Sequence, residues 1–357
     1  MSELEEDQAP IPPPRNNPNL VGQEAAEAEF LGAFEAERLA HAWLIGGPRG
    51  VGKATLAYRM ARYVLSQSGA EGGAAGLFGE LSPGEGEGGQ GLYLAPENDI
   101  FRRVASGGHA DFLGIQREVN DKTKKLRGEI TVEQIRRVGH FLSMTPAEGG
   151  WRVVLIDSAD EMNPNAANAL LKVLEEPPKR ALLLLVSHNA GRLIPTILSR
   201  CRHLNARSLD EDEMIACLGV YRPEMDQTDA ALLARICEGS LGRALDFAGD
   251  GGLDLYHQLM AILDALPDLD VEAVHGLGDR LARDRENKSL ATVRDLLLWW
   301  LAGLIRQTAA EGADIAGWIQ AWDGISHQLS RAQTANLDNK QLIINVFFAL
   351  EKAARAG

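Results

Sequence analysis

The stretch HAWLIGGPRGVGKATLAYRMARYVL, residues 41–65, joins a short apolar run, a glycine-rich turn and a helical pattern. Its turn, from Gly47 to Lys53, matches the phosphate-loop pattern G-x-x-x-x-G-K. The glycines let successive backbone N–H groups turn toward a phosphate, and the following helix directs the positive end of its dipole there. The alternative is a glycine turn that merely packs tightly. Because a strand precedes the turn and a helix follows it, the sequence favours a phosphate-binding loop.

The candidate nucleotide-contacting residues of this loop are Gly47, Pro48, Arg49, Gly50, Val51, Gly52, Lys53, Ala54 and Thr55. Lys53 is expected to reach the terminal phosphates, and the next position normally offers a hydroxyl to magnesium. Here that position is Ala54. Thr55 follows, but it is rotated by about 100° around the helix. We therefore do not expect its hydroxyl to bind magnesium in place of the hydroxyl missing at Ala54. ATP is therefore the candidate cofactor, and we expect Mg²⁺ to bind only together with ATP. The sequence leaves open whether ATP binds.

The segment WRVVLID, 151–157, is typical of a buried parallel strand that ends in an acid. Asp157 stands where nucleotide-binding proteins place a magnesium-organising aspartate, although a simple strand-ending cap is the alternative. Hydrolysis needs a glutamate next, and Ser158 lacks both the charge and the pKa of a general base. Asp160 and Glu161 lie further along the chain, and we expect them to point away. The site therefore lacks two groups needed for hydrolysis.

Strands alternate with helices up to about residue 207, which predicts a parallel sheet covered on both faces. Further apolar runs occur at 181–187 and near His203. We expect an extended arm at 1–19, a flexible glycine-rich insertion at 68–92, and helices at Gln23–Leu39, near Thr131, at Asn165–Glu176 and at Ile194–Ser199. Beyond Asp210 the sequence predicts helices alone.

Composition narrows the class of protein. A formal net charge of -14 and a pI near 5.1 argue against a broad basic surface for nucleic acid. The three cysteines, Cys201, Cys217 and Cys237, are odd in number and widely spaced, which argues against a disulfide framework or a cysteine zinc site. No apolar run approaches the roughly 20 residues that span a bilayer. We expect a cytoplasmic protein that binds no zinc and has no polymerase or exonuclease chemistry.

The segment NALLKVLEEPP, 168–178, together with Ser199-Arg200-Cys201 and the phosphate loop, resembles the clamp-loader family of the AAA+ superfamily. The resemblance covers most of residues 15–250. It implies an α/β AAA+ core at 1–207 with a parallel five-stranded sheet in the order 5-1-4-3-2. It also implies a small helical lid at 208–250 and a helical collar at 254–357. Many bacterial relatives carry a four-cysteine zinc module where this chain has the insertion at 68–92.

The resemblance also implies roles for single residues. Lys53 corresponds to the phosphate-binding lysine and Asp157 to the magnesium aspartate, while Ser187 falls near the polar sensor of the terminal phosphate. Arg200 corresponds to an arginine finger that acts in trans on a neighbour's ATP, with an ion pair inside the subunit as the alternative. Arg243 lies near the lid's sensor arginine, one residue later than in the motor subunits.

The family implies a subunit of the DNA polymerase III holoenzyme that assembles with delta and gamma/tau subunits in a hetero-pentamer. That complex loads the sliding clamp on primer-template DNA, with no membrane involved. Because Ala54 and Ser158 weaken the site, we expect an assembly subunit without ATPase activity of its own. One alternative is an active gamma/tau-like ATPase motor. Another is a P-loop kinase outside replication, against which LLKVLEEPP and Ser-Arg-Cys argue.

Overall fold

The computed structural model describes residues 12–68, 91–120, 126–249, 251–284, 287–335 and 338–356. Most of the predicted insertion at 68–92 lies outside these residues, as do residues 1–11 of the predicted arm. The chain forms two compact units, 1–242 and 243–357, which are described separately. The predicted lid begins in the first unit, and the division between the units falls inside it.

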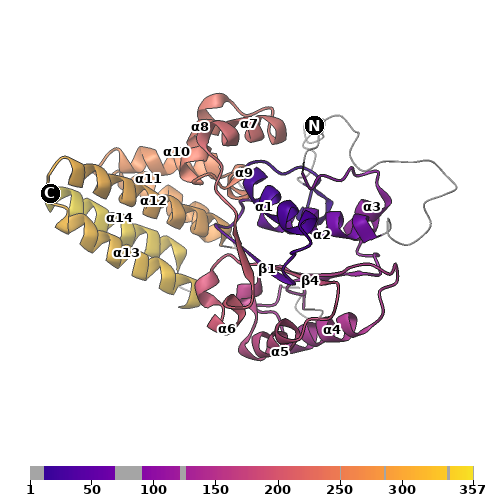
Figure 1. The fold of residues 1–357 in the computed structure, drawn as a ribbon. Helices are drawn as coiled ribbons and strands as arrows, with labels where there is room; N and C mark the ends of the chain where they lie inside the picture. Colours follow the sequence, from indigo (N-terminus) through magenta and orange to yellow (C-terminus); the bar gives the residue numbers. More distant parts are fainter. Residues whose placement is uncertain are drawn as a thin grey trace. The chain divides into compact units, whose positions relative to one another are not determined.

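The first unit is built on a five-stranded parallel sheet (Figure 1). Its strands are β1 (Ala42–Gly46), β2 (Phe112–Ile115), β3 (Arg152–Ile156), β4 (Ala181–Val186) and β5 (Arg202–Asn205). They lie in the order β2-β3-β4-β1-β5. This is the predicted order 5-1-4-3-2 read from the opposite edge, so the predicted sheet order is confirmed.

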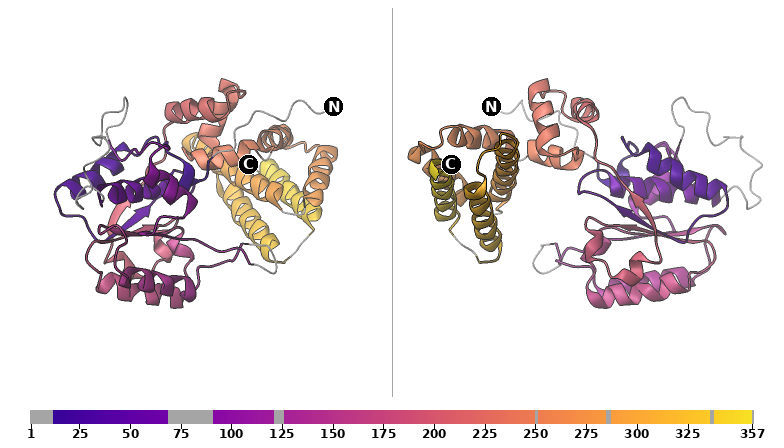
Figure 2. Two further views of the ribbon diagram at one scale, coloured as in Figure 1. Left: turned by 90° about the vertical axis from the view of Figure 1, so that its right-hand side faces the viewer. Right: turned by 60° about the vertical axis from the view of Figure 1, so that its left-hand side comes forward.

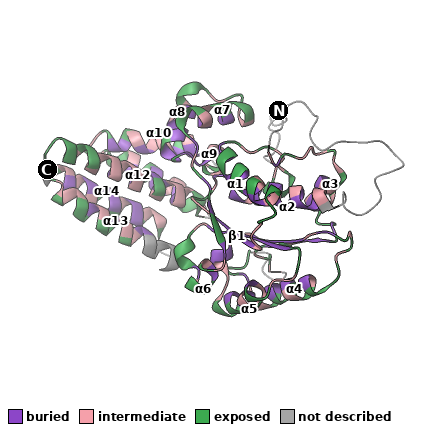
Figure 3. Cartoon of the chain, viewed as in Figure 1, coloured by how far each residue is buried: buried purple, intermediate pink, exposed green. Residues whose placement is uncertain are grey.

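Helices cover both faces of this sheet, which explains why its central strands are apolar apart from Arg152 at the start of β3. On one face lie α1 (Glu24–Glu35), α2 (Lys53–Ser68) and α3 (Asp99–Ser106). On the other lie α4 (Val132–Ser143), α5 (Pro164–Glu175) and α6 (Pro195–Leu198). Successive strand residues alternate between the two layers: Trp43 packs with the first set and Leu44 with the second. Figure 2 shows the two layers, and Figure 3 shows the buried strands between them.

Local signals explain where several helices begin and end. Thr131 and Gln134 form a capping box at the start of α4, as the helix predicted near Thr131 requires. The predicted helix Gln23–Leu39 is shorter, because Glu37 adopts a positive φ of 54° just after α1 ends. The arm is also not simply extended, since Pro14–Asn16 form a 3-10 turn. Arg62 of α2 donates to Asn17 O at 3.0 Å and so holds this segment.

The remaining described chain is helical, as expected beyond Asp210. The first unit continues with α7 (Glu211–Tyr221) and α8 (Gln227–Ile236), and α9 (Leu241–Gly249) leads into the second unit. That unit contains α10 (Gly252–Leu263), α11 (Val271–Arg283), α12 (Lys288–Ala310), α13 (Ala316–Ala335) and α14 (Asn339–Ala356). Leu297, Ile325 and Phe347 are fully buried in its interior. Of the helices described, none is long and apolar enough to cross a membrane.

Candidate nucleotide site

The phosphate loop connects β1 to α2 and has the backbone shape that its glycines predict. Gly47, Gly50 and Gly52 adopt positive φ values of 138°, 80° and 92°. A Cβ at Gly47 would lie 2.5 Å from Ala206 O, so a side chain does not fit there. The buried Lys53 folds back over the loop, and its Nζ donates to Gly47 O at 2.7 Å and to Pro48 O. The loop is therefore preformed around the amine.

The residues after the lysine lie at the start of α2. Ala54 is half-buried and offers no oxygen, while Thr55 is buried at 6% exposure. Magnesium would have to rely on Asp157 and on the phosphates of a nucleotide. Within the described ranges, no three His, Cys, Asp or Glu residues are grouped so as to hold a metal ion. The three cysteines are buried and form no disulfide.

Lys53 and Asp157 influence each other's charge at the carboxyl ends of β1 and β3. Burial lowers the pKa of Lys53 to about 8, while the charges of Asp160 and Asp157 oppose this shift. Burial raises the pKa of Asp157, Glu161 raises it further, and Lys53 works in the opposite direction. The structure thus brings these two predicted site residues close enough for the charge of each to affect the pKa of the other.

Ser158 follows in a left-handed conformation, with φ 62° and ψ 53°. Its Oγ lies 3.2 Å from Nε2 of His188, the second residue after β4. Burial lowers the pKa of His188 to about 4, and the Lys53 charge acts in the same direction. The imidazole is therefore neutral near pH 7. The position at which hydrolysis needs a glutamate holds a serine paired with this histidine.

Asp160 corrects one sequence expectation. Instead of pointing away, it is 7% exposed, and its Oδ1 accepts the His188 N–H at 2.9 Å. The cause is the 3-10 turn Ala159–Glu161, which folds the chain back toward the end of β4. Sequence reasoning placed Asp160 away from the site and missed His188. The acidic pair after the strand was a signal for Asp160, but no pattern identified His188.

Ser187 lies directly after β4, and its N–H donates to Ile45 O at 3.0 Å. This bond fixes the residue beside β1, near the start of the phosphate loop. Its side chain is fully buried, and Oγ finds no hydrogen-bond partner among the residues described. Its role as a sensor of the terminal phosphate stays a prediction.

Arg200 follows α6 and makes contacts inside its own subunit. Its Nη2 lies 2.9 Å from Glu175 Oε1, and its Nη1 donates to Thr196 O at 3.0 Å. The two side chains of the ion pair are 35% and 50% exposed. The geometry therefore contains the intrasubunit ion pair that the sequence left as an alternative. Arg243 belongs to the second unit, and its sensor role stays a prediction.

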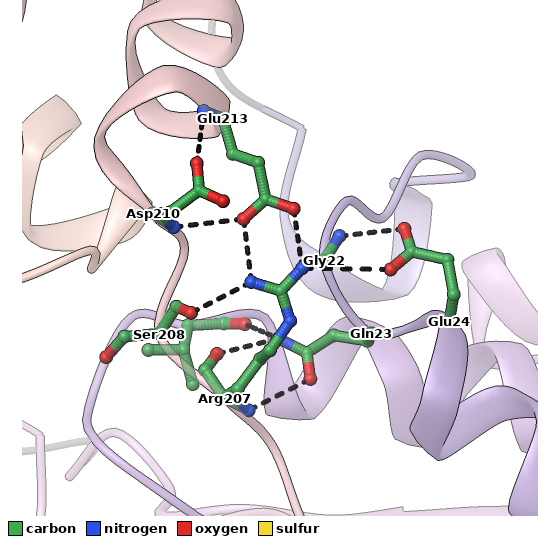
Figure 4. Close-up of polar contacts among 8 residues, drawn as sticks. Gly22, Gln23, Glu24, Arg207, Ser208, Asp210 and Glu213 are labelled. Atoms are coloured by element: carbon green, nitrogen blue, oxygen red, sulfur yellow. Dashed lines mark hydrogen bonds and ion pairs between the residues drawn. The ribbon is translucent and has the colours of Figure 1, made fainter.

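A buried amide links the loop to the chain entering α7 (Figure 4). Gln23 is 2% exposed, and its Nε2 donates to Val51 O at 3.2 Å and to Arg207 O at 2.8 Å. Its Oε1 accepts Arg207 N–H at 3.1 Å. The Arg207 guanidinium pairs in turn with Glu213 of α7. No sequence pattern predicts this connection, because Gln23 and Arg207 are far apart in the chain.

Comparison with known proteins shows what this chain is similar to. Residues 96–210 match the family model described as DNA polymerase III, delta subunit. The chain is 40% identical over 162 residues to the DNA polymerase III subunit delta' of Pseudomonas aeruginosa, covering 45% of this chain and 42% of that protein. It is 26% identical over 330 residues to the tau subunit of Escherichia coli, covering 90% of this chain and 44% of that protein. The chain is therefore similar to subunits of DNA polymerase III.

The chain spans less than half the length of these two curated relatives, at 42% and 44%. Among solved structures, it is similar to a DNA polymerase III gamma subunit-related protein of Thermotoga maritima, with a TM-score of 0.41 and 17% identity. That match covers 92% of this chain and 99% of the other. The Thermotoga maritima RuvB branch migration motor matches with a TM-score of 0.40 and 14% identity, covering 85% and 87%.

The pKa of Lys53 predicts how anion binding varies with pH. An ammonium group attracts phosphate, but above pH 8 a growing fraction of Lys53 is neutral in the free protein. Binding must then restore a proton, so affinity for a fluorescent ATP analogue should fall about tenfold per pH unit well above pH 8. Titrations from pH 7 to 9.5 measure this, with Lys53→Met as the pH-insensitive control. Equal affinity across that range would contradict the role of Lys53.

Proposed function

We propose that the chain is a delta-prime subunit of a DNA polymerase III clamp loader, acting in the cytoplasm without ATPase activity of its own. The observation that carries the proposal is a preformed phosphate loop in a site that lacks both groups needed for hydrolysis. Ala54 offers no oxygen to magnesium, and Ser158 faces His188 instead of presenting a carboxylate. The 40% identity to the delta' subunit supports the same assignment.

In this proposal the chain assembles with delta and gamma/tau subunits in a hetero-pentamer that loads the sliding clamp on primed DNA. Residues 254–357 serve as the collar that joins the subunits, and residues 208–250 serve as the lid. Arg200 acts in trans on ATP held by a neighbour. ATP with Mg²⁺ remains a candidate ligand of this chain's own loop, and zinc is not expected.

We expect steady-state phosphate release by the purified chain to equal that of a Lys53→Ala variant. The physical reason is the missing base at 158, because general acid–base catalysis contributes about a hundred- to ten-thousandfold to a rate. The measurement is a coupled phosphate assay on the isolated protein at saturating ATP and Mg²⁺. Equal rates agree with an assembly subunit.

The second candidate function is an active gamma/tau-like motor. The similarity to the tau subunit, at 26% identity over 330 residues, favours it. The same phosphate assay separates the two candidates. A robust turnover that Lys53→Ala abolishes would establish the motor and refute the proposal of an inactive assembly subunit.

A further inference from the structure

Every backbone carbonyl of the phosphate loop from Gly47 to Val51 accepts a hydrogen bond. Lys53 Nζ serves the first two, as described above. Arg49 O accepts the Ser240 hydroxyl at 2.7 Å, and Gly50 O accepts Gly242 N–H at 2.9 Å. Val51 O accepts the Gln23 amide. Two of these donors come from residues 239–242, which we call the ledge, at the entry to α9.

The ledge reaches the loop because Gly242 has no side chain. A Cβ at this position would lie 2.9 Å from Gly50 Cα and 3.1 Å from Gly50 O. Both are backbone atoms, so a side chain would have to push the loop away. Ser240, which bonds the neighbouring carbonyl, is 1% exposed. The contact is therefore a close fit of two backbones rather than a loose surface approach.

The ledge is anchored on its other side to the chain that enters α7. Leu209 N–H donates to Gly239 O at 2.9 Å. Gly239 has a φ of 74°, and a Cβ there would lie 2.0 Å from Leu209 O. Two residues before Leu209, Arg207 is hydrogen-bonded to Gln23 (Figure 4). Gln23 in turn donates to Val51 O. Hydrogen bonds thus join the loop to the ledge and the ledge to the entry to α7. Through Gln23, they also join that entry back to the loop.

We propose that the ledge is a latch, made by the protein's own groups, which holds α7 and α8 against the phosphate loop and keeps the loop in one shape. The bonds involve no nucleotide atom, so ATP is not required to close the latch. Loop and ledge should therefore open together or not at all. This inference concerns the chain's own conformation and holds whether or not Arg200 acts on a neighbour.

Hydrogen exchange of the full-length chain tests the latch, with peptides that cover the loop (47–53) and the ledge (239–242). In the wild type without ATP, both should exchange slowly, and adding ATP should leave exchange of the ledge unchanged. Gly242→Ala should speed exchange of both peptides by about tenfold or more, the effect of losing two hydrogen bonds of ordinary net strength. Alanine normally stabilises a helix relative to glycine. A loss of protection therefore reports the contact with Gly50.

Gly219→Ala is the matched control, because a Cβ at this glycine of α7 meets nothing within 4 Å. It should leave both peptides unchanged. Ser240→Ala removes one bond without adding atoms, and it should speed loop exchange even if Gly242→Ala folds poorly. The proposal fails if Ser240→Ala leaves the loop as protected as in the wild type, or if ATP alone alters ledge exchange in the wild type.

Discussion

If Arg200 acts in trans as proposed, Arg200→Ala should leave assembly of the proposed complex intact while reducing ATP hydrolysis about a thousandfold at the neighbouring site. An arginine finger neutralises charge that develops on the transferred phosphoryl group. Clamp loading by the reconstituted complex should fall as well. ATPase assays with clamp and primed DNA, after size-exclusion chromatography to verify assembly, provide the measurement. A subunit without its own ATPase would thus be needed for hydrolysis elsewhere.

The ion pair with Glu175 does not prevent this role. Both side chains are substantially exposed, and exposed pairs contribute about 0–1 kcal/mol. A neighbour's phosphate can therefore replace the carboxylate at little cost. Arg200→Lys should recover little activity, because a lysine ammonium lacks the planar fork of donors that matches phosphate.

Glu175→Gln is the control that separates a finger from a structural ion pair. It removes the charge partner and leaves the guanidinium in place. If Arg200 acts on a neighbour, Arg200→Ala loses hydrolysis and Glu175→Gln keeps it. If the ion pair itself matters, the two variants should behave alike. A complex with Arg200→Ala that loads clamps at the wild-type rate would refute the finger.

The sequence predicted those features that depend on local patterns. Continuous apolar runs identified the central strands, because a strand covered on both faces has no polar side. The spacing of the glycines and Lys53 identified the loop. The same patterns could not reveal His188 beside Ser158, since that contact depends on how the 3-10 turn Ala159–Glu161 folds.

The contacts of the ledge could not be predicted from local sequence patterns either, because they join residues far apart in the chain. Ser240 and Gly242 bond carbonyls that precede them by almost two hundred residues. Every residue has a backbone carbonyl, so these acceptors leave no pattern in the sequence. Gly242 differs from other glycines of the chain in its close approach to Gly50, which becomes visible only once the sheet and α7–α9 are in place.

Glu27→Ala is expected to cost about 3–5 kcal/mol of stability, the usual effect of removing one partner from a buried ion pair. Glu27 of α1 pairs with Arg59 of α2, and their side chains are 11% and 8% exposed. Arg59 also holds the segment before α1 by donating to Pro18 O. Without Glu27 its guanidinium remains buried without a countercharge. Urea unfolding followed by tryptophan fluorescence should show a lower midpoint for the first unit.

Glu29→Ala supplies the matched comparison two residues further along α1. Glu29 pairs with Arg202 at 2.9 Å, but these side chains are 43% and 42% exposed. Water already solvates both charges, so the loss should be about 0–1 kcal/mol. The two variants remove the same group from the same helix, and burial of the partner is the difference that matters. Equal shifts in the unfolding midpoint would show that the Arg59 pair does not hold α1 on α2.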